Sequence, residues 1–160
     1  MILPDLPAAG HATLTLVFAT LALTVLLVAI ARADLRTLRI PDPLNAALIL
    51  TGLGLAAMGP RLADHGIGAA VGYALFWGIG EAYFRRTGRE GLGLGDAKLF
   101  AGAGAWLGWQ ALPFVLLIAA LGGLVAALLQ RGRGGVAEVA FGPWLAVGLW
   151  VLWMRAVLIG

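Results

Sequence analysis

Long apolar runs alternate along the chain with short clusters of charged residues, glycine and proline. Several of the runs approach the roughly 20 residues that a helix needs to cross a hydrocarbon core of about 30 Å. They cover residues 11–31, 44–58, 67–84, 92–112, 113–129 and 139–159. Continuous apolar runs favour helices, because the strands of a membrane barrel would alternate apolar and polar positions. We therefore expect an all-α polytopic membrane protein, a bundle of about six transmembrane helices forming a single domain over residues 1–160.

The basic residues between these runs predict how the bundle is oriented. Alternate connections hold Arg32, Arg36 and Arg39, then Arg85, Arg86 and Arg89, then Arg131 and Arg133. The other side of the membrane receives only Arg61 and the late Arg155. Basic loops stay in the cytoplasm during membrane insertion. We therefore expect the three basic connections to be cytoplasmic and both termini to be extracytoplasmic.

Composition supports a membrane protein and excludes several other classes. The chain is 61% hydrophobic and only 12% charged, and its mean hydropathy of +0.95 is far above that of soluble domains. The net charge is only +3, and no basic face with interleaved aromatic residues is present, so we expect no nucleic-acid partner. The absence of cysteine excludes disulfides and thiolate metal sites. His11 and His65 both fall on the predicted outer side, so we expect no metal site and no cofactor.

Two pairs of glycines have the spacing of close helix contacts. Gly68 and Gly72 lie in the third run, and Gly104 and Gly108 lie in the fourth. Glycines four residues apart let two helix backbones approach closely. We expect these glycines to serve helix packing.

The stretch "GLGLGDAKL" places two charged residues where the fourth apolar run begins. From Phe100 to the turn at "QALP" there are only about 11 residues, which is too short to cross the core at about 1.5 Å per residue. The helix must therefore begin near Leu92 and carry Asp96 and Lys98 in its first turns. Ionisable residues at the membrane boundary are candidates for function.

The chain has only eight acidic residues, so each can be considered. We expect Glu81 to pair with an arginine near the cytoplasmic end of the third run. Asp42, between two prolines in "IPDPLN", is expected to cap the second helix. Asp34 follows the first run directly and Asp96 opens the fourth, so both should lie on one side of the membrane at similar depth.

Two carboxylates in one site can share a proton, because two like charges a few ångströms apart cannot both ionise cheaply. One can then act as general base on a water while the other donates a proton to a scissile carbonyl, as in aspartic peptidases. Gly93 and Gly95 bring no side chains, so an extended substrate could approach the backbone beside Asp96. The residues alone leave an alternative, in which Asp34 and Asp96 simply pair with neighbouring basic side chains at the membrane surface.

Three motifs in order resemble those of the type IV prepilin peptidase family: "DLRTLRIPDPLN", "GLGLGDAKLFAGAGAWLGW" and "FGPWLAVG". The resemblance implies that Asp34 and Asp96 are the two catalytic residues of a membrane aspartic peptidase. It implies removal of the short basic leader of prepilins or pseudopilins, after a glycine, at the cytoplasmic face of the bacterial inner membrane. Lys98 matches the lysine of the family's "GDxKL", with either an electrostatic role or a role as a membrane-surface anchor. Presenilin-like enzymes share the GxGD motif, but Ala33 stands where they have tyrosine and no "PAL" motif is present.

Two expectations concern the departures from the family and the substrate. With no cysteines and no room for an N-terminal cytoplasmic region, the chain resembles the short, core-only members, and we do not expect N-methyltransferase activity. Three acidic residues could receive a basic leader, although they could instead balance the arginines of the loops: Glu81, Glu90 and Glu138.

The rival function is a non-enzymatic membrane protein, a small transporter or an assembly subunit for pili or secretion, with the aspartates as ion or proton sites.

Overall fold

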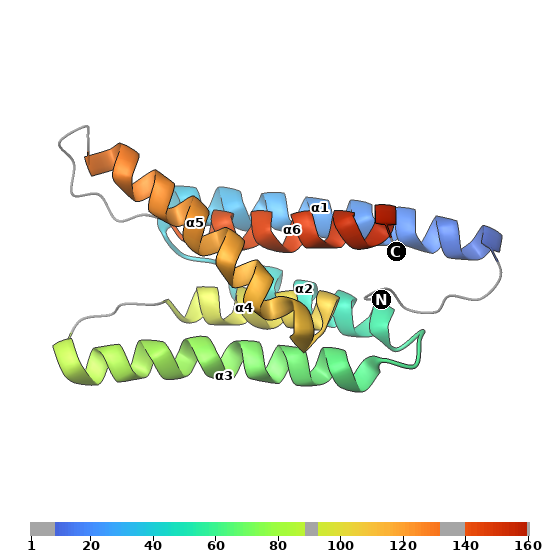
Figure 1. Ribbon diagram of the computed structural model, residues 1–160, viewed down its shortest axis with the longest axis horizontal. Helices are drawn as coiled ribbons and strands as arrows, with labels where there is room; N and C mark the ends of the chain where they lie inside the picture. The colour runs from blue at the N-terminus through green and yellow to red at the C-terminus, as the bar shows by residue number, and fades with distance from the viewer. Residues whose placement is uncertain (1–8, 89–92, 132–139, 160) are drawn as a thin grey trace.

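The structure, a computed structural model, describes residues 9–88, 93–131 and 140–159 (Figure 1). In these ranges the regular elements are α1 (Ala9–Thr37), α2 (Asp42–Ala56), α3 (Leu62–Thr87), α4 (Leu94–Leu107), the 3₁₀ turn η1 (Trp109–Ala111), α5 (Leu112–Arg131) and α6 (Gly142–Ile159). The described residues thus form six α-helices, which confirms the predicted all-α class and the assignment of one helix to each apolar run.

The helices differ in how far they can reach across a membrane. Among the described residues, three stretches are long and apolar enough to span a bilayer: Thr13–Thr37, Trp109–Leu129 and Gly142–Ile159. Helices α2 and α4 have only 15 and 14 residues, and at about 1.5 Å per residue neither reaches the full thickness of about 30 Å. The prediction of a fourth helix over 92–112 is therefore wrong in its bounds. Helix α4 stops at Leu107, because Gly108 takes a positive φ of 78° and turns the chain into η1.

Helix α4 can be short because it lies inside the bundle. Every residue from Leu99 to Leu107 is buried, and α4 packs against α2, α3, α5 and α6. Small residues allow this close approach. A Cβ placed on Gly68 would lie 2.7 Å from the carbonyl oxygen of Gly104, and one placed on Gly72 would lie 2.8 Å from the carbonyl oxygen of Phe100. The predicted packing role is confirmed for Gly68, Gly72 and Gly104, at the contact of α3 with α4. For Gly108 it is wrong, because this glycine ends α4 with its positive φ.

Successive helices run in opposite directions, so helix ends gather at two ends of the bundle (Figure 1). We call the end at which α1 and α3 finish and α2, α4 and α6 begin the cavity end. Helix α1 reaches Thr37, beyond the predicted limit at Ala31, so Asp34 lies within its last turns and not after it. The helix ends because Leu38 takes a positive φ of 51° and donates its N–H to the Asp34 carbonyl at 2.8 Å. The chain then turns toward Pro41, and a proline disfavours the helical conformation in the residue that precedes it, here Ile40.

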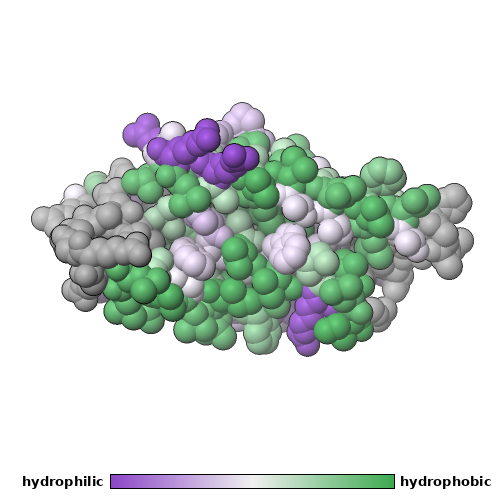
Figure 2. All heavy atoms as spheres, turned by 90° about the horizontal axis from the view of Figure 1, so that it is seen from above, coloured by the Kyte–Doolittle hydropathy of each residue, from purple (hydrophilic) through white to green (hydrophobic). Residues whose placement is uncertain are grey.

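The outer surface of the bundle is largely hydrophobic. Figure 2 shows a mostly apolar face, with a hydrophilic patch along its upper edge and a smaller one at its lower edge. Large apolar side chains stand exposed on several helices, among them Phe18, Val25 and Leu121. Soluble monomers rarely expose apolar patches of this extent, whereas a lipid-facing surface requires them.

The end opposite the cavity holds a buried histidine. His65 is 5% exposed, and its Nδ1 donates to the carbonyl oxygen of Ala105 at 2.9 Å. The ring of His65 therefore satisfies a backbone carbonyl where α3 packs on α4. The side chain of His11 lies outside the described residues.

Candidate active site

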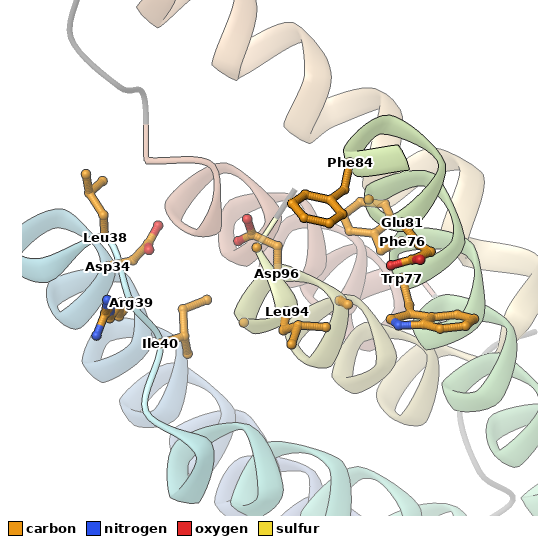
Figure 3. A pocket seen from close by; sticks show the side chains of 14 residues that line it. Asp34, Leu38, Arg39, Ile40, Phe76, Trp77, Glu81, Phe84, Leu94 and Asp96 are labelled. Carbon is orange, nitrogen blue, oxygen red and sulfur yellow. The ribbon is translucent and has the colours of Figure 1, made fainter. Parts of the chain in front are cut away.

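A cavity of about 560 Å³ lies at the cavity end, lined by α1, α3, α4 and the turn that follows α1. Its polar side chains are Asp34, Arg39, Glu81 and Asp96. Aromatic side chains from α3 form part of its wall: Phe76, Trp77 and Phe84. Figure 3 shows the carboxylates of Asp34 and Asp96 pointing toward each other from α1 and α4. The structure therefore brings together, in one cavity, two aspartates that lie 62 positions apart in the sequence.

Asp34 is held firmly by the residues around it. Asp34 lies in the last turns of α1 and is only 6% exposed. The backbone N–H of Gly142 donates to Asp34 Oδ2 at 3.0 Å. Gly142 is the first residue of α6, where N–H groups have no acceptor within their own helix. Asp34 therefore satisfies a free donor at the start of α6.

Asp96 stands in the first turn of α4 and is half-buried. Its N–H donates to the Gly93 carbonyl at 3.1 Å, which closes the first turn of the helix. The preceding carbonyl, that of Gly95, accepts a hydrogen bond of 3.2 Å from Nδ2 of Asn45 in α2. Helix α2 thus fixes the backbone immediately before Asp96.

The two glycines before Asp96 have different surroundings. Both line the cavity. A Cβ on Gly93 would meet Asp96 Oδ2 at 3.7 Å, an ordinary contact, whereas a Cβ on Gly95 would press against Ile40 Cβ at 3.2 Å. Packing therefore explains a glycine at 95, while at 93 the space remains open toward the cavity.

Lys98 turns away from the cavity and pairs with α2. Its Nζ donates to Asp42 Oδ1 at 2.5 Å, and Lys98 is not among the residues that line the cavity. The prediction that Asp42 caps α2 is wrong. Asp42 is already the first residue of the helix, Pro41 holds the N-cap position, and no side-chain cap hydrogen bond forms. The carboxylate instead joins the start of α2 to the start of α4.

Of the three glutamates considered for a basic leader, only Glu81 lies within the described residues. It lines the cavity and accepts a hydrogen bond of 2.7 Å from Arg85 Nε, which confirms the expected pairing with an arginine. Glu90 and Glu138 lie outside the described residues. Within those residues, no three His, Cys, Asp or Glu side chains gather as a set of metal ligands.

Comparison with known proteins identifies the family. The profile of the type IV leader peptidase family matches residues 21–128, about two thirds of the chain. The chain belongs to the type IV leader peptidase family. The matched residues include both aspartates of the cavity. The family and the apolar helices together indicate a multi-pass protein of the bacterial inner membrane.

Curated relatives of the chain are named prepilin leader peptidase/N-methyltransferase. The protein from Pectobacterium carotovorum is 47% identical over 120 residues, which are 72% of this chain and 43% of that protein. The one from Aeromonas hydrophila is 42% identical over 142 residues, 84% of this chain and 49% of that protein. The one from Escherichia coli is 45% identical over 121 residues, 72% of this chain and 53% of that protein. The chain thus spans about half the length of these relatives. No solved structure matches it.

Sequence reasoning missed two residues of the site, Asn45 and Gly142. Asn45 had a signal, because a lone amide in an apolar helix needs a hydrogen-bond partner when it is buried. Gly142 had a weaker one in the pair Gly-Pro, which is common where a helix begins. Neither signal shows which residue lies opposite.

Proposed function

We propose that the chain is an aspartic endopeptidase that removes the short basic leader of prepilins or pseudopilins. The observation that carries the proposal is the pair of carboxylates, Asp34 and Asp96, that face each other across one cavity (Figure 3). Membership of a peptidase family favours this function over a transporter or an assembly subunit.

The chemistry requires that the pair hold one proton between its two carboxyl groups. The ionised carboxylate removes a proton from a water as the water oxygen attacks the scissile carbonyl carbon. The protonated partner gives its proton to the carbonyl oxygen, which forms a neutral tetrahedral diol. As the diol collapses and the C–N bond breaks, the protonated carboxyl gives its proton to the leaving nitrogen and the ionised one takes a proton from a diol hydroxyl, so the pair again holds one proton. Because the two groups titrate together, we assign these roles to the pair as a unit.

The cavity end is proposed to face the cytoplasm, with both termini on the opposite side. Basic residues gather at this end, among them Arg32, Arg36, Arg85 and Arg86, and basic segments stay in the cytoplasm. A substrate helix in the bilayer would then bring the junction with its leader to the level of Asp34 and Asp96. The open space beside Gly93 would receive the extended backbone at that junction.

Glu81 is proposed to attract the basic leader. It lines the cavity, and its pairing with Arg85 lies at the exposed edge of that cavity. Exposed charge pairs contribute up to about 1 kcal/mol, so Glu81→Gln should lower kcat/KM about threefold for a basic leader and leave a neutral leader unaffected. Equal cleavage of basic and charge-reversed leaders by wild type and by Glu81→Gln would remove this role.

The proposed function is tested with the purified chain in detergent and a prepilin-like substrate that has a basic leader and a hydrophobic segment. We expect a single cut after the glycine that precedes the hydrophobic segment, identified by the mass of both products. Asp34→Asn and Asp96→Asn should each abolish that cut, with melting temperatures near that of wild type showing that the variants are folded. Full cleavage by either variant would contradict the proposal.

A further inference from the structure

The first residue of α6, Gly142, lies directly against the carboxylate of Asp34. The Gly142 N–H donates to Oδ2 at 3.0 Å. A Cβ built on Gly142 would lie 2.7 Å from the same oxygen and 3.1 Å from Cγ. Contacts of a Cβ atom below 3.0 Å essentially never occur in real proteins. Any other residue at 142 would therefore displace either α6 or the carboxylate.

The backbone conformation of Gly142 does not explain the glycine. Among the described residues, Gly88 and Gly108 are the glycines with positive φ, at 67° and 78°, and there a side chain would be strained by the backbone itself. Gly142 has no such φ. The space taken by Asp34 is what excludes a side chain at 142.

Helices α1 and α6 are joined along their length as well as at this contact. Trp153 Nε1 donates to Thr20 Oγ1 at 2.9 Å, and Trp150 Nε1 donates to Thr24 Oγ1 at 3.2 Å. Two side chains of α6 therefore hold it against α1. The Gly142 amide is thus presented to Asp34 from a helix that is already fixed in place.

We propose that Gly142 is a positioning residue of the peptidase: its amide fixes one oxygen of Asp34, and its missing side chain leaves room for the carboxylate to face the cavity. The inference rests on the proposed function, since it assigns a purpose to the orientation of Asp34. It also gives the "FGPWLAVG" motif a task in the site, at a residue 108 positions from Asp34.

The kinetic test compares two alanine variants of the same helix. Gly148→Ala is the matched control, because its Cβ would also lie 2.7 Å from its nearest atom, here the backbone carbonyl oxygen of Val115 in α5, which makes it at least as disruptive to the fold but leaves Asp34 untouched. For Gly142→Ala we expect kcat to fall about 100-fold, the effect of a misplaced catalytic group, with KM unchanged. Gly148→Ala should lower the melting temperature and keep kcat. Gly142→Ala with wild-type kcat, or with the same kinetics as Gly148→Ala, would overturn the proposal.

A second measurement tests the contact between residue 142 and Asp34 and does not depend on catalytic activity. Melting temperatures are compared for wild type, Gly142→Ala, Asp34→Ala and the double variant. We expect Gly142→Ala to lower the melting temperature in the presence of Asp34 and to have much less effect once Asp34 is alanine, because the atoms it strikes are gone. Equal shifts in both backgrounds would overturn the contact. This arm stays informative even if the chain cleaves no prepilin, so failure of the proposed function and failure of this inference are distinguishable.

A backbone substitution keeps the test decisive if Gly142→Ala does not fold. Incorporation of glycolic acid at 142 replaces the N–H by an ester oxygen and adds no side chain. Loss of one hydrogen bond to a carboxylate should lower kcat about tenfold and leave KM unchanged. An ester variant with wild-type kcat would show that the amide does not position Asp34.

Discussion

The two sides of the cavity hold their aspartates in different ways. On the side of α1 and α6, Asp34 is buried and its carboxylate is bound directly by a backbone N–H. On the side of α2 and α4, Asp96 is half-buried, and within the described residues no hydrogen bond reaches its carboxylate. There the backbone is what is fixed, through the Asn45 amide on the Gly95 carbonyl. One side therefore fixes a side chain, and the other fixes a backbone and leaves the side chain open to the cavity.

This difference follows from where each aspartate lies in its helix. Asp34 lies in the last turns of α1, whose own amides are used within the helix, so its donor must come from another helix. Asp96 lies in the first turn of α4 beside Gly93 and Gly95. These glycines have no side chain to obstruct an approaching peptide. We therefore expect the substrate to enter along the Asp96 side, toward an Asp34 carboxylate that is already oriented.

Among changes on the Asp96 side that keep the aspartate itself, the largest effect is expected at Asn45. Asn45 is 1% exposed, and its Oδ1 is buried with no hydrogen-bond partner in the described structure. An unpaired buried polar atom costs about 1–3 kcal/mol, so this asparagine is a poor choice for stability alone and its bond to Gly95 explains it better. Asn45→Ala should lower kcat about 100-fold, because the backbone before Asp96 loses its tie.

The control for Asn45 lies in the same helix. A Cβ on Gly54 would meet nothing within 4 Å, so Gly54→Ala should leave kcat unchanged and stabilise α2 by up to about 1 kcal/mol. Steady-state cleavage and thermal melting of both variants provide the comparison. An Asn45→Ala enzyme as active as Gly54→Ala would show that the Asp96 side needs no such support.

A smaller effect should separate the two glycines before Asp96. Gly95→Ala presses on buried Ile40, with 3.2 Å between the two Cβ atoms, and should destabilise the fold by about 1–3 kcal/mol. Gly93→Ala meets only an ordinary contact in an extended backbone conformation, so its melting temperature should stay at the wild-type value. If the substrate passes beside Gly93, the KM of the Gly93→Ala variant should rise about tenfold. Wild-type KM for Gly93→Ala would place the substrate path elsewhere.

The smallest effect is expected at the ion pair outside the cavity. Lys98 and Asp42 are 32% and 72% exposed in their side chains, and exposed ion pairs contribute about 0–1 kcal/mol. Lys98→Met should therefore shift the melting temperature slightly and keep kcat within about twofold, as should Asp42→Asn. A large loss of kcat in Lys98→Met with a normal melting temperature would return Lys98 to an electrostatic role in catalysis.

The helices themselves were predictable because the cost of placing charge in lipid leaves a strong pattern in the sequence. Their ends were less so. Hydropathy marks where apolar residues stop, whereas α1 continues through Asp34 to Thr37, since charged residues outside the apolar core are compatible with helix. Helix α4 ends at Gly108 by a backbone turn that hydropathy does not detect.

The contacts within the site were not predictable, because they depend on which helices are neighbours. Asp34 and Asp96 could be placed at similar depth from topology alone. The bonds from Gly142 to Asp34 and from Asn45 to Gly95 join residues 108 and 50 positions apart. Asp42 is a residue type that often caps helices. The packing of α2 on α4 instead brings Lys98 close enough to pair with its carboxylate.

The central claim is that Asp34 and Asp96 act as one catalytic unit, and cleavage rates of the two single asparagine variants and of the double variant test it most directly. Groups that share one proton should not contribute additively. Each single variant should lose about 10³-fold or more of kcat, and Asp34→Asn/Asp96→Asn should be no slower than either. Losses that multiply in the double variant, or a single variant that cleaves like wild type, would contradict the account.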